Sequence, residues 1–333
     1  MEQRRSGRQK CRKGGEKLIR ISQLKLPITH TKTQLEKKIA KTLKNPGNSF
    51  TYEIRKQSLD CRHKNDKIFV YTVDVTIRDE QKLAKKVNNN NIMLIKEKPY
   101  EFPSPGETPL LHSPVIVGSG PAGLFCGWYL AKAGYCPIIL ERGEEAEKRQ
   151  KTVENFWKNG VLDPESNVQF GEGGAGTFSD GKLNTLVKDP YGRNHEVLKR
   201  FVAAGAPEEI IYQQKPHLGT DVLVGIVEKM RHEIEEMGGK FCFRSKVTDL
   251  IFENNTLKEI EINNDKRIPA QVCVLAPGHS ARDTFEMLQK RGVYMEPKSF
   301  AVGLRIEHPQ EMINMDLYGE PENELLGAAS YKV

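Results

Sequence analysis

The most regular hydrophobic pattern in the chain lies in KIFVYTVDVTI, at residues 67–77. Apolar side chains stand at every second position from Phe69 to Ile77, with mostly shorter or polar residues between them. Successive side chains of a strand point to opposite faces, so this alternation predicts a strand with one buried face. Shorter apolar runs predict further strands at 18–24, 49–55 and 92–97.

Two helices are predicted between these strands. Leu35, Ile39 and Leu43 share one helical face, and Thr33 with Glu36 fits a capping box at its start. A second, short helix is expected at 79–87, followed by an asparagine turn at 88–91. An Asn-Pro-Gly turn at 45–47 separates the first helix from the second strand. The resulting order, β-α-β-β-α-β, predicts a small α+β ferredoxin-like domain over residues 17–97.

A proline-rich segment at 98–113 predicts a linker to a larger α/β domain over residues 114–298. That domain opens with PVIV, an apolar strand, followed by Gly118, Gly120 and Gly123 and a helix that starts near Pro121. A second apolar strand, PIIL, ends at Glu141. A strand, a G-x-G-x-x-G turn, a helix and a second strand ending on an acid together predict a Rossmann-type dinucleotide site.

Each part of this motif has a physical role. Gly118 permits the tight turn, Gly120 lets a pyrophosphate approach the backbone, and Gly123 lets the helix pack close to the strand. The helix start offers free N–H groups and a partial positive charge to phosphate. Gly134 is a predicted C′ stop for this helix. Glu141 can accept hydrogen bonds from both adenosine ribose hydroxyls and would repel a 2′-phosphate, which disfavours NADP here.

Two further glycine segments bear on the choice between FAD and NAD. Residues 170–185, FGEGGAGTFSDGKLNT, can bring backbone N–H groups against an anion or a flat ring. Residues 271–284 form an apolar strand that ends in Ala-Pro-Gly before a new helix. Between them a helix at 220–237, a strand near 241–245 and a β-meander are expected. The predicted cofactor contacts are Gly118, Ser119, Gly120, Pro121, Ala122, Gly123, Glu141, Arg142, Gly173, Gly174, Gly176, Thr177, Ala276 and Gly278.

In these motifs the chain resembles a bacterial family of FAD-dependent dehydrogenases in the glutathione-reductase-like flavoprotein superfamily. The resemblance rests on VIVGSGPAGL, VQFGEGGAGTFSDGKLNT, KPHLGTD and SFAVGLRIEHP, and on KQSLDCRHKNDKIFVYTVDV in the first domain. It implies FAD bound at the glycine turn, with residues 171–182 close to the flavin, and NAD(P)H as an electron donor. It also implies that Pro277 replaces the usual Thr of an Ala-Thr-Gly-like turn.

The family pattern further implies a late glycine-rich segment that closes the FAD site. The sequence ends at LLGAASYKV without one, so residues 299–333 are expected to be the start of an incomplete substrate domain in a C-terminally truncated chain.

The sequence names few candidates for catalysis, because hydride chemistry resides on the cofactor. Lys182 and Asp180 are weak candidates in the glycine-rich loop, with Glu172 as an alternative for proton handling. His217 and His279 stand beside loop glycines and are candidates for a general acid or base. The chain has neither metal-ligand spacing nor a G-x-S-x-G elbow or P-loop lysine.

Composition adds a charge asymmetry and a cellular expectation. Residues 1–100 contain 25 Lys and Arg against 10 Asp and Glu, although the whole chain carries only +7. Residues 1–16 predict a basic, disordered tail, and nucleic-acid binding by the basic front module is the alternative function. Six scattered cysteines without a C-x-x-C pair, and the lack of a signal or membrane-spanning segment, predict a cytoplasmic protein. An inactive flavoprotein fragment is the third interpretation.

Overall fold

The computed structural model describes residues 17–44, 49–78, 80–87, 89–96, 100–178, 181–183, 185, 187–214, 216–300, 302–304 and 306–330. The predicted basic tail at 1–16 and the Asn-Pro-Gly turn at 45–47 lie outside these residues. Within them, no helix is long and apolar enough to cross a lipid bilayer.

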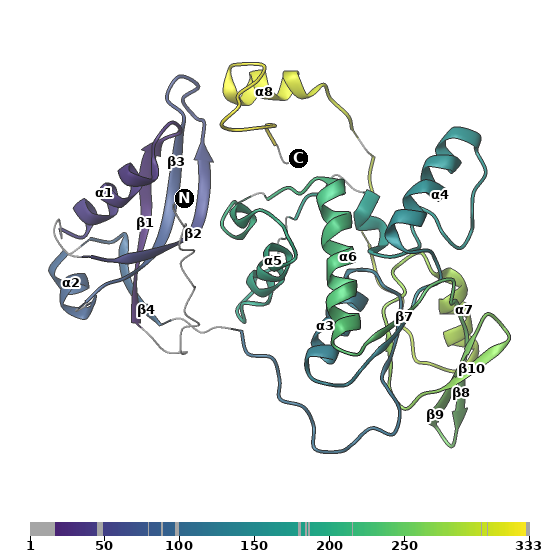
Figure 1. The fold of residues 1–333 in the computed structure, drawn as a ribbon. Helices are drawn as coiled ribbons and strands as arrows, with labels where there is room; N and C mark the ends of the chain where they lie inside the picture. The colour runs from purple at the N-terminus through teal and green to yellow at the C-terminus, as the bar shows by residue number, and fades with distance from the viewer. Residues whose placement is uncertain are drawn as a thin grey trace, which may run out of the picture.

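The N-terminal module contains six elements in the predicted order β-α-β-β-α-β (Figure 1). Its four strands form one sheet in the order β2-β3-β1-β4, and every neighbouring pair is antiparallel. Each βαβ unit therefore brackets a strand of the other, which is how a split βαβ sheet is built. The elements are β1 (Lys17–Pro27), α1 (Lys32–Thr42), β2 (Thr51–Asp60), β3 (Ile68–Thr76), α2 (Glu80–Val87) and β4 (Ile92–Lys96).

The capping box of α1 differs from the prediction. Thr31, not Thr33, is the N-cap: its hydroxyl accepts from the Gln34 amide at 3.3 Å, and Gln34 Oε1 accepts from Thr31 N at 2.7 Å. Both pairs satisfy the S/T-x-x-E/Q pattern. A turn in which His30 N donates to Pro27 O ends immediately before Thr31, so Thr31 is the first residue placed to cap the helix.

The core of this module follows the alternation seen in the sequence. Ile39 from α1 and Val73 and Val75 from β3 are fully buried in one cluster. On the opposite face of β3, Asp74 is also buried, and Arg20 binds its two carboxylate oxygens at 2.7 and 2.8 Å. Arg55 contacts the same carboxylate at 3.2 Å, so the buried charge is paired.

The predicted linker contains neither helix nor strand from residue 100 to residue 114. It packs on the next domain through aromatic contacts. Phe102 stacks on Tyr129 with ring centroids 4.5 Å apart, and Tyr100 meets the same ring edge-on at 6.4 Å.

The second domain is built on a parallel sheet with the order β11-β5-β6-β7. Its strands are β5 (Val115–Val117), β6 (Ile138–Leu140), β7 (Lys240–Cys242) and β11 (Cys273–Leu275). Alternate residues serve opposite faces. Ile116 packs with α3 (Pro121–Lys132) and α6 (Thr220–Glu236), whereas Val115 and Val117 pack with the β-meander and α7 (Arg282–Lys290).

The predicted order of this domain is present, including the crossover through the meander β8 (Val247–Glu253), β9 (Thr256–Ile262) and β10 (Lys266–Pro269). Gly134 is the C′ residue of α3, as predicted, with φ +83°. Gly134 N donates to Ala131 O and Tyr135 N to Leu130 O, which is a Schellman motif. Five elements of the structure are not among those predicted from the sequence: α4 (Ala146–Asn159), η1 (Gly174–Phe178), α5 (Arg193–Ala203), η2 (Glu208–Ile211) and α8 (Gln310–Tyr318).

The C-terminal segment returns to the N-terminal module, as Figure 1 shows for α8. Lys67 forms an ion pair with Glu320 at 2.7 Å, and Lys64 Nζ donates to Met315 O at 3.3 Å. Segments some 250 residues apart in the sequence therefore contact each other.

Candidate functional site

The glycine turn joins β5 to α3, and two of its glycines are required by packing. A Cβ on Gly118 would lie 2.3 Å from Ala276 O, and the residue also has φ +98°. A Cβ on Gly123 would lie 1.9 Å from Gly118 O. Both distances are far below contact, so these positions hold the turn, the helix and the neighbouring strand end together.

Gly120 differs from both neighbours in the motif. A Cβ there would meet no atom closer than Gly174 Cα at 3.9 Å, and its φ of −66° suits any residue. Gly120 is the N-cap of α3 but gives the helix no side-chain cap, and Pro121 and Ala122 are exposed. The first turn of α3 is thus reachable from outside and carries the partial positive charge of a helix start.

Glu141 directly follows β6 and is only 4% exposed. Its Oε2 accepts from Ser119 N at 2.9 Å and Ser119 Oγ at 2.7 Å, while its Oε1 accepts from Gly143 N at 2.9 Å and Gly171 N at 3.0 Å. A carboxylate has about four lone-pair sites. The side chain predicted to bind ribose therefore links the glycine turn to the loop that begins at Gly171.

That loop lies directly against the glycine turn. Gly173 N donates to Ser119 O at 3.0 Å, and a Cβ on Gly174 would lie 3.2 Å from Gly120 Cα. Gly173 and Gly174 have φ of +80° and +66°, so the close approach relies on glycine. The structure brings these two predicted contact residues to the start of α3. Gly176 and Thr177 follow them in η1.

A buried arginine organises the same loop. Arg149, from α4, donates to the carbonyls of Asn167, Val168, Glu172 and Gly174 at 2.7–3.0 Å. It also donates to Thr177 Oγ1 at 2.9 Å. Burial lowers the pKa of Arg149 to about 10, which leaves it cationic at neutral pH. Its signal in the sequence is an arginine on the face of α4 that also carries Ala146 and Val153, both buried.

Glu172 is fully buried and serves the architecture of the loop. It accepts from Ala146 N at 2.8 Å and from Arg231 Nε at 2.8 Å. Burial raises the pKa of Glu172, against the opposing effect of these two donors. The sequence suggests Glu172 as an alternative for proton handling. In the structure its carboxylate links the loop to α4 and α6.

The Ala-Pro-Gly turn after β11 lies beside the glycine turn. Ala276 N donates to Val117 O at 2.9 Å, and Ala276 O is the atom nearest to a Cβ on Gly118. Gly278 has φ +75° and open space around it. The two turns therefore meet at the carboxyl end of the parallel sheet, where open α/β sheets bind ligands.

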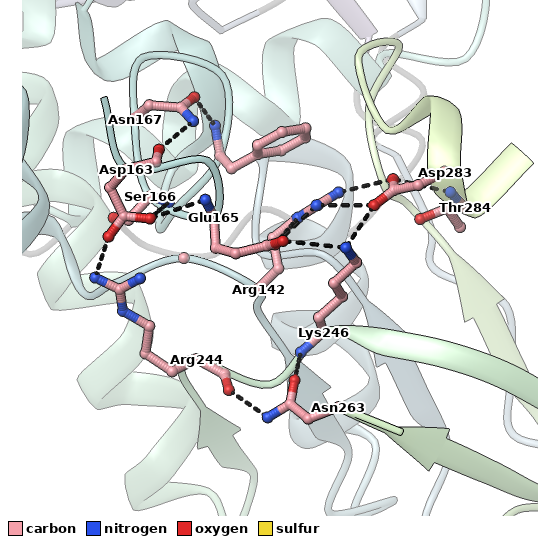
Figure 2. A network of polar contacts seen from close by, with 12 residues as sticks. Arg142, Asp163, Glu165, Ser166, Asn167, Arg244, Lys246, Asn263, Asp283 and Thr284 are labelled. Atoms are coloured by element: carbon pink, nitrogen blue, oxygen red, sulfur yellow. Dashed lines mark hydrogen bonds and ion pairs between the residues drawn. The ribbon is translucent and has the colours of Figure 1, made fainter. Parts of the chain in front are cut away.

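Arg142 belongs to an ion-pair network at this edge (Figure 2). It binds Glu165 at 2.7 Å and Asp283 at 2.9 Å, and its guanidinium lies 3.9 Å from the centre of the Phe170 ring. Lys246 bridges the same two acids at 3.0 and 2.7 Å. Burial alone would raise the pKa of Asp283, but the hydrogen bonds from Arg142 and Lys246 outweigh burial and hold that pKa well below its ordinary value.

The candidates for proton handling are distributed as follows. Lys182 and His217 pair in an antiparallel bridge, flanked by bonds from Leu183 N to Pro216 O and from Leu218 N to Gly181 O. Paired residues of such a bridge project from the same face. His279 is exposed beside Ser280, and Asp180 lies outside the described residues. No cluster of His, Cys, Asp or Glu among the described residues could hold a metal ion.

Three family models match separate parts of the chain. Residues 116–151 match an NAD(P)-binding Rossmann-like domain, and residues 299–333 match a family described as FAD-dependent protein, C-terminal domain-like. Residues 18–76 match a domain of unknown function. The Rossmann-like match and the FAD-dependent match confirm a flavoprotein with a Rossmann-like dinucleotide-binding domain and FAD as its cofactor.

The chain is similar over most of its length to one curated protein. It is 44% identical over 317 residues to an uncharacterised protein of Clostridium beijerinckii, covering 95% of this chain and 59% of that protein.

Two solved structures are each similar to part of the chain. One is THI4 of Thermovibrio ammonificans, at 21% identity, with 55% of this chain and 63% of that chain covered and a TM-score of 0.37. Another is L-proline dehydrogenase of P. horikoshii, at 16% identity, with 55% and 56% covered and a TM-score of 0.31.

Proposed function

We propose that this chain is the cofactor-binding part of an FAD-dependent oxidoreductase of the dehydrogenase type. The first turn of α3 takes the pyrophosphate beside Gly120, and the loop from Gly171 to Phe178 extends along the cofactor toward the flavin. NAD(P)H is the proposed electron donor. The substrate domain is proposed to begin at residue 299, where the second family match starts.

The open side of Gly120 carries this proposal. Packing explains Gly118 and Gly123, because a Cβ at either position would collide with backbone. Among the described residues, no atom comes close enough to require glycine at position 120, which lies at a helix start without a side-chain cap. Serine, asparagine or aspartate would cap this helix better than glycine. A ligand that needs close backbone approach accounts for the choice, and an anion accounts for its place at a helix N-terminus.

The hydrogen bonds around Glu141 are compatible with FAD if one of its four protein donors is replaced by a ribose hydroxyl. Glu141 is surrounded by four protein donors, so a ribose hydroxyl must replace one of them. The Ser119 hydroxyl is the donor that can leave without moving backbone, because rotation about its side-chain bond is enough. The remaining three N–H donors keep Glu141 fixed while it accepts from the ribose.

Bound FAD supplies hydride transfer, and the protein supplies position and protons. Lys182 and His217 are the residues that we propose to hold or move a proton, because their bridge puts both on one face of a strip that continues the cofactor loop. Arg149 holds that loop in place through its hydrogen bonds to loop carbonyls.

The test replaces Gly120 by valine and measures FAD affinity by flavin absorbance and fluorescence titration. We expect at least a tenfold loss of affinity, because the side chain occupies the approach to the helix start. The fold should persist, with about 1 kcal/mol lost from the poorer N-cap. Gly225→Ala in α6 is the matched control: its Cβ meets nothing within 4 Å, so FAD affinity should stay unchanged. Full FAD affinity in a folded Gly120→Val protein would contradict the proposed site.

A further inference from the structure

A large cleft lies outside the dinucleotide site, between the N-terminal module and the second domain. Its volume is about 1800 Å³. One wall comes from β2 and β3, a second from α5 and η2, and a third from residues 316–330 after and within α8. Figure 1 shows these three segments around one region of the molecule. Clefts between domains are a preferred place for small-molecule sites.

The walls are joined by specific bonds. Gln57 N, on the outer edge of β2, donates to Tyr212 O at 2.7 Å, and Gln214 N donates back to Gln57 O at 3.1 Å. This short parallel bridge attaches the second domain to the edge of the N-terminal sheet. The ion pair of Lys67 with Glu320 attaches the third wall. The cleft is therefore framed by contacts of the chain with itself.

Aromatic side chains gather on the wall of the cleft that the N-terminal module provides. Phe69 and Tyr71 lie side by side on β3 with ring centroids 6.1 Å apart, and the His30 ring meets Tyr71 edge-on at 5.4 Å. Phe50 and Tyr52 form a second pair at 6.3 Å. Such faces favour a planar ring. The six Phe and Tyr side chains of the lining are Phe50, Tyr52, Phe69, Tyr71, Tyr212 and Tyr318.

Three of these tyrosines supply neutral hydrogen-bond donors. Burial raises the pKa of Tyr212 to about 12, and the nearby acids and the phenols of Tyr71 and Tyr52 add to the shift. Burial also raises the pKa of Tyr52 and of Tyr71, whose hydroxyl oxygen accepts from Gln57 Nε2 at 2.8 Å. The phenols therefore stay protonated throughout the physiological pH range and can donate to carbonyl oxygens.

The formal charges of the lining cancel. The basic side chains are Lys32, Arg55, Arg62, Lys64 and Lys199, and the acidic ones are Glu36, Glu53, Glu208, Glu209 and Asp316. Arg55 is further engaged by the buried Asp74. A cleft with no net charge does not favour a phosphate or a polycarboxylate. The leucine and isoleucine side chains of the lining are Ile28, Leu35, Ile54, Leu59, Ile211, Leu317, Leu325 and Leu326.

We propose that this cleft binds an uncharged planar ring compound with carbonyl oxygens, of the quinone class. The ring stacks among the aromatic side chains, the carbonyls accept from the tyrosine hydroxyls, and an apolar substituent lies along the leucine and isoleucine side chains. The proposal goes beyond the FAD site, and binding in the cleft requires no FAD.

The test is calorimetric titration of the full chain, without added FAD, using 2,3-dimethyl-1,4-naphthoquinone. Both carbons of the quinone double bond carry methyl groups in this probe, so Cys61, which also lines the cleft, has no unsubstituted carbon there for conjugate addition. Tyr212→Phe keeps the ring and removes the hydroxyl, so the dissociation constant should rise roughly 2- to 12-fold, the worth of one hydrogen bond. Tyr294→Phe is the control, because Tyr294 is 82% exposed and lies outside the cleft lining.

Charge selectivity provides a second readout. The anionic 2,3-dimethyl-1,4-naphthoquinone-6-sulfonate, whose quinone double bond is also fully substituted, should bind at least tenfold more weakly than the uncharged probe. The proposal is overturned if neither compound binds at millimolar concentration, if the sulfonate binds equally well, or if Tyr212→Phe, shown folded by circular dichroism, binds like the wild type. Because the cleft lies outside the proposed FAD site and the titration needs no FAD, a failure here leaves the proposed FAD site untouched.

Discussion

The two folded regions of this chain use different means to become rigid. The N-terminal sheet has long strands whose alternate apolar residues meet two helices, and its buried core is almost wholly apolar. The parallel sheet of the second domain has strands of only three residues. Around its ligand-facing edge, buried Glu141, Arg149 and Glu172 hold the loops together through backbone groups.

The difference shows where function constrains a fold. An apolar core tolerates changes of shape when its volume is kept. A buried charged side chain that binds several backbone groups tolerates few substitutions, because removing it leaves those backbone groups without hydrogen-bond partners. The region that we propose to present N–H groups to FAD therefore depends on single polar side chains, whereas the core of the N-terminal module depends on many apolar side chains.

The largest effect is expected from Arg149→Met, which keeps the length of the side chain and removes its donors. Four carbonyls and the Thr177 hydroxyl lose the donor that Arg149 provides, although Thr177 Oγ1 still donates to Gly174 O. We expect a loss of about 3–5 kcal/mol in the free energy of unfolding, measured by urea denaturation. Lys148→Met, on the exposed side of the same helix, should stay within about 0.5 kcal/mol of the wild type. Equal stability of both variants would contradict this role of Arg149.

A smaller effect is expected from Ile39→Val in the apolar core of the N-terminal module. Ile39 is fully buried, and the substitution removes one methylene group without introducing a polar atom. The free energy of unfolding should fall by about 0.5–1.5 kcal/mol. FAD affinity, measured by the same flavin titration, should remain that of the wild type. A loss of several kcal/mol would mean that this core is as intolerant as the cofactor edge.

The smallest effect concerns acid. The hydrogen bond from Arg244 lowers the pKa of Asp163 from its ordinary value of 3.8. An acid with a depressed pKa in the folded state stabilises above its unfolded pKa and loses that contribution as pH falls through the folded value. The melting temperature should therefore fall below about pH 4, and less steeply in Asp163→Asn than in the wild type. Parallel melting curves of the two proteins from pH 5 to pH 2.5 would refute the assignment.

Much of the scaffold can be predicted from the sequence because it depends on local patterns. Period-two alternation in β3, the glycine spacing before α3 and the acid after β6 each identify an element without knowledge of its neighbours. The Schellman stop at Gly134 is of the same kind. The predicted N-cap of α1, Thr33, is wrong because two capping patterns overlap in the sequence. The turn before the helix selects Thr31 instead.

The rest of the site depends on contacts between distant segments. Arg149 is a charged residue in a helix, and only the approach of residues 167–177 makes it a buried donor. The ion pairs of Arg142 with Glu165 and Asp283 join three segments that lie far apart in the sequence, so no local pattern predicts them. The cofactor roles of Glu141 and Arg142 remain predictions, because both side chains bind protein partners here.

The most direct test of the account is the flavin content of the wild-type protein. The chain would be purified, its visible absorbance recorded, and FAD then added and titrated, with any released flavin identified after denaturation. The account predicts bound FAD, or uptake of added FAD with a rise in melting temperature that grows with its concentration. A folded, colourless protein that takes up no FAD and shows no such rise would contradict it.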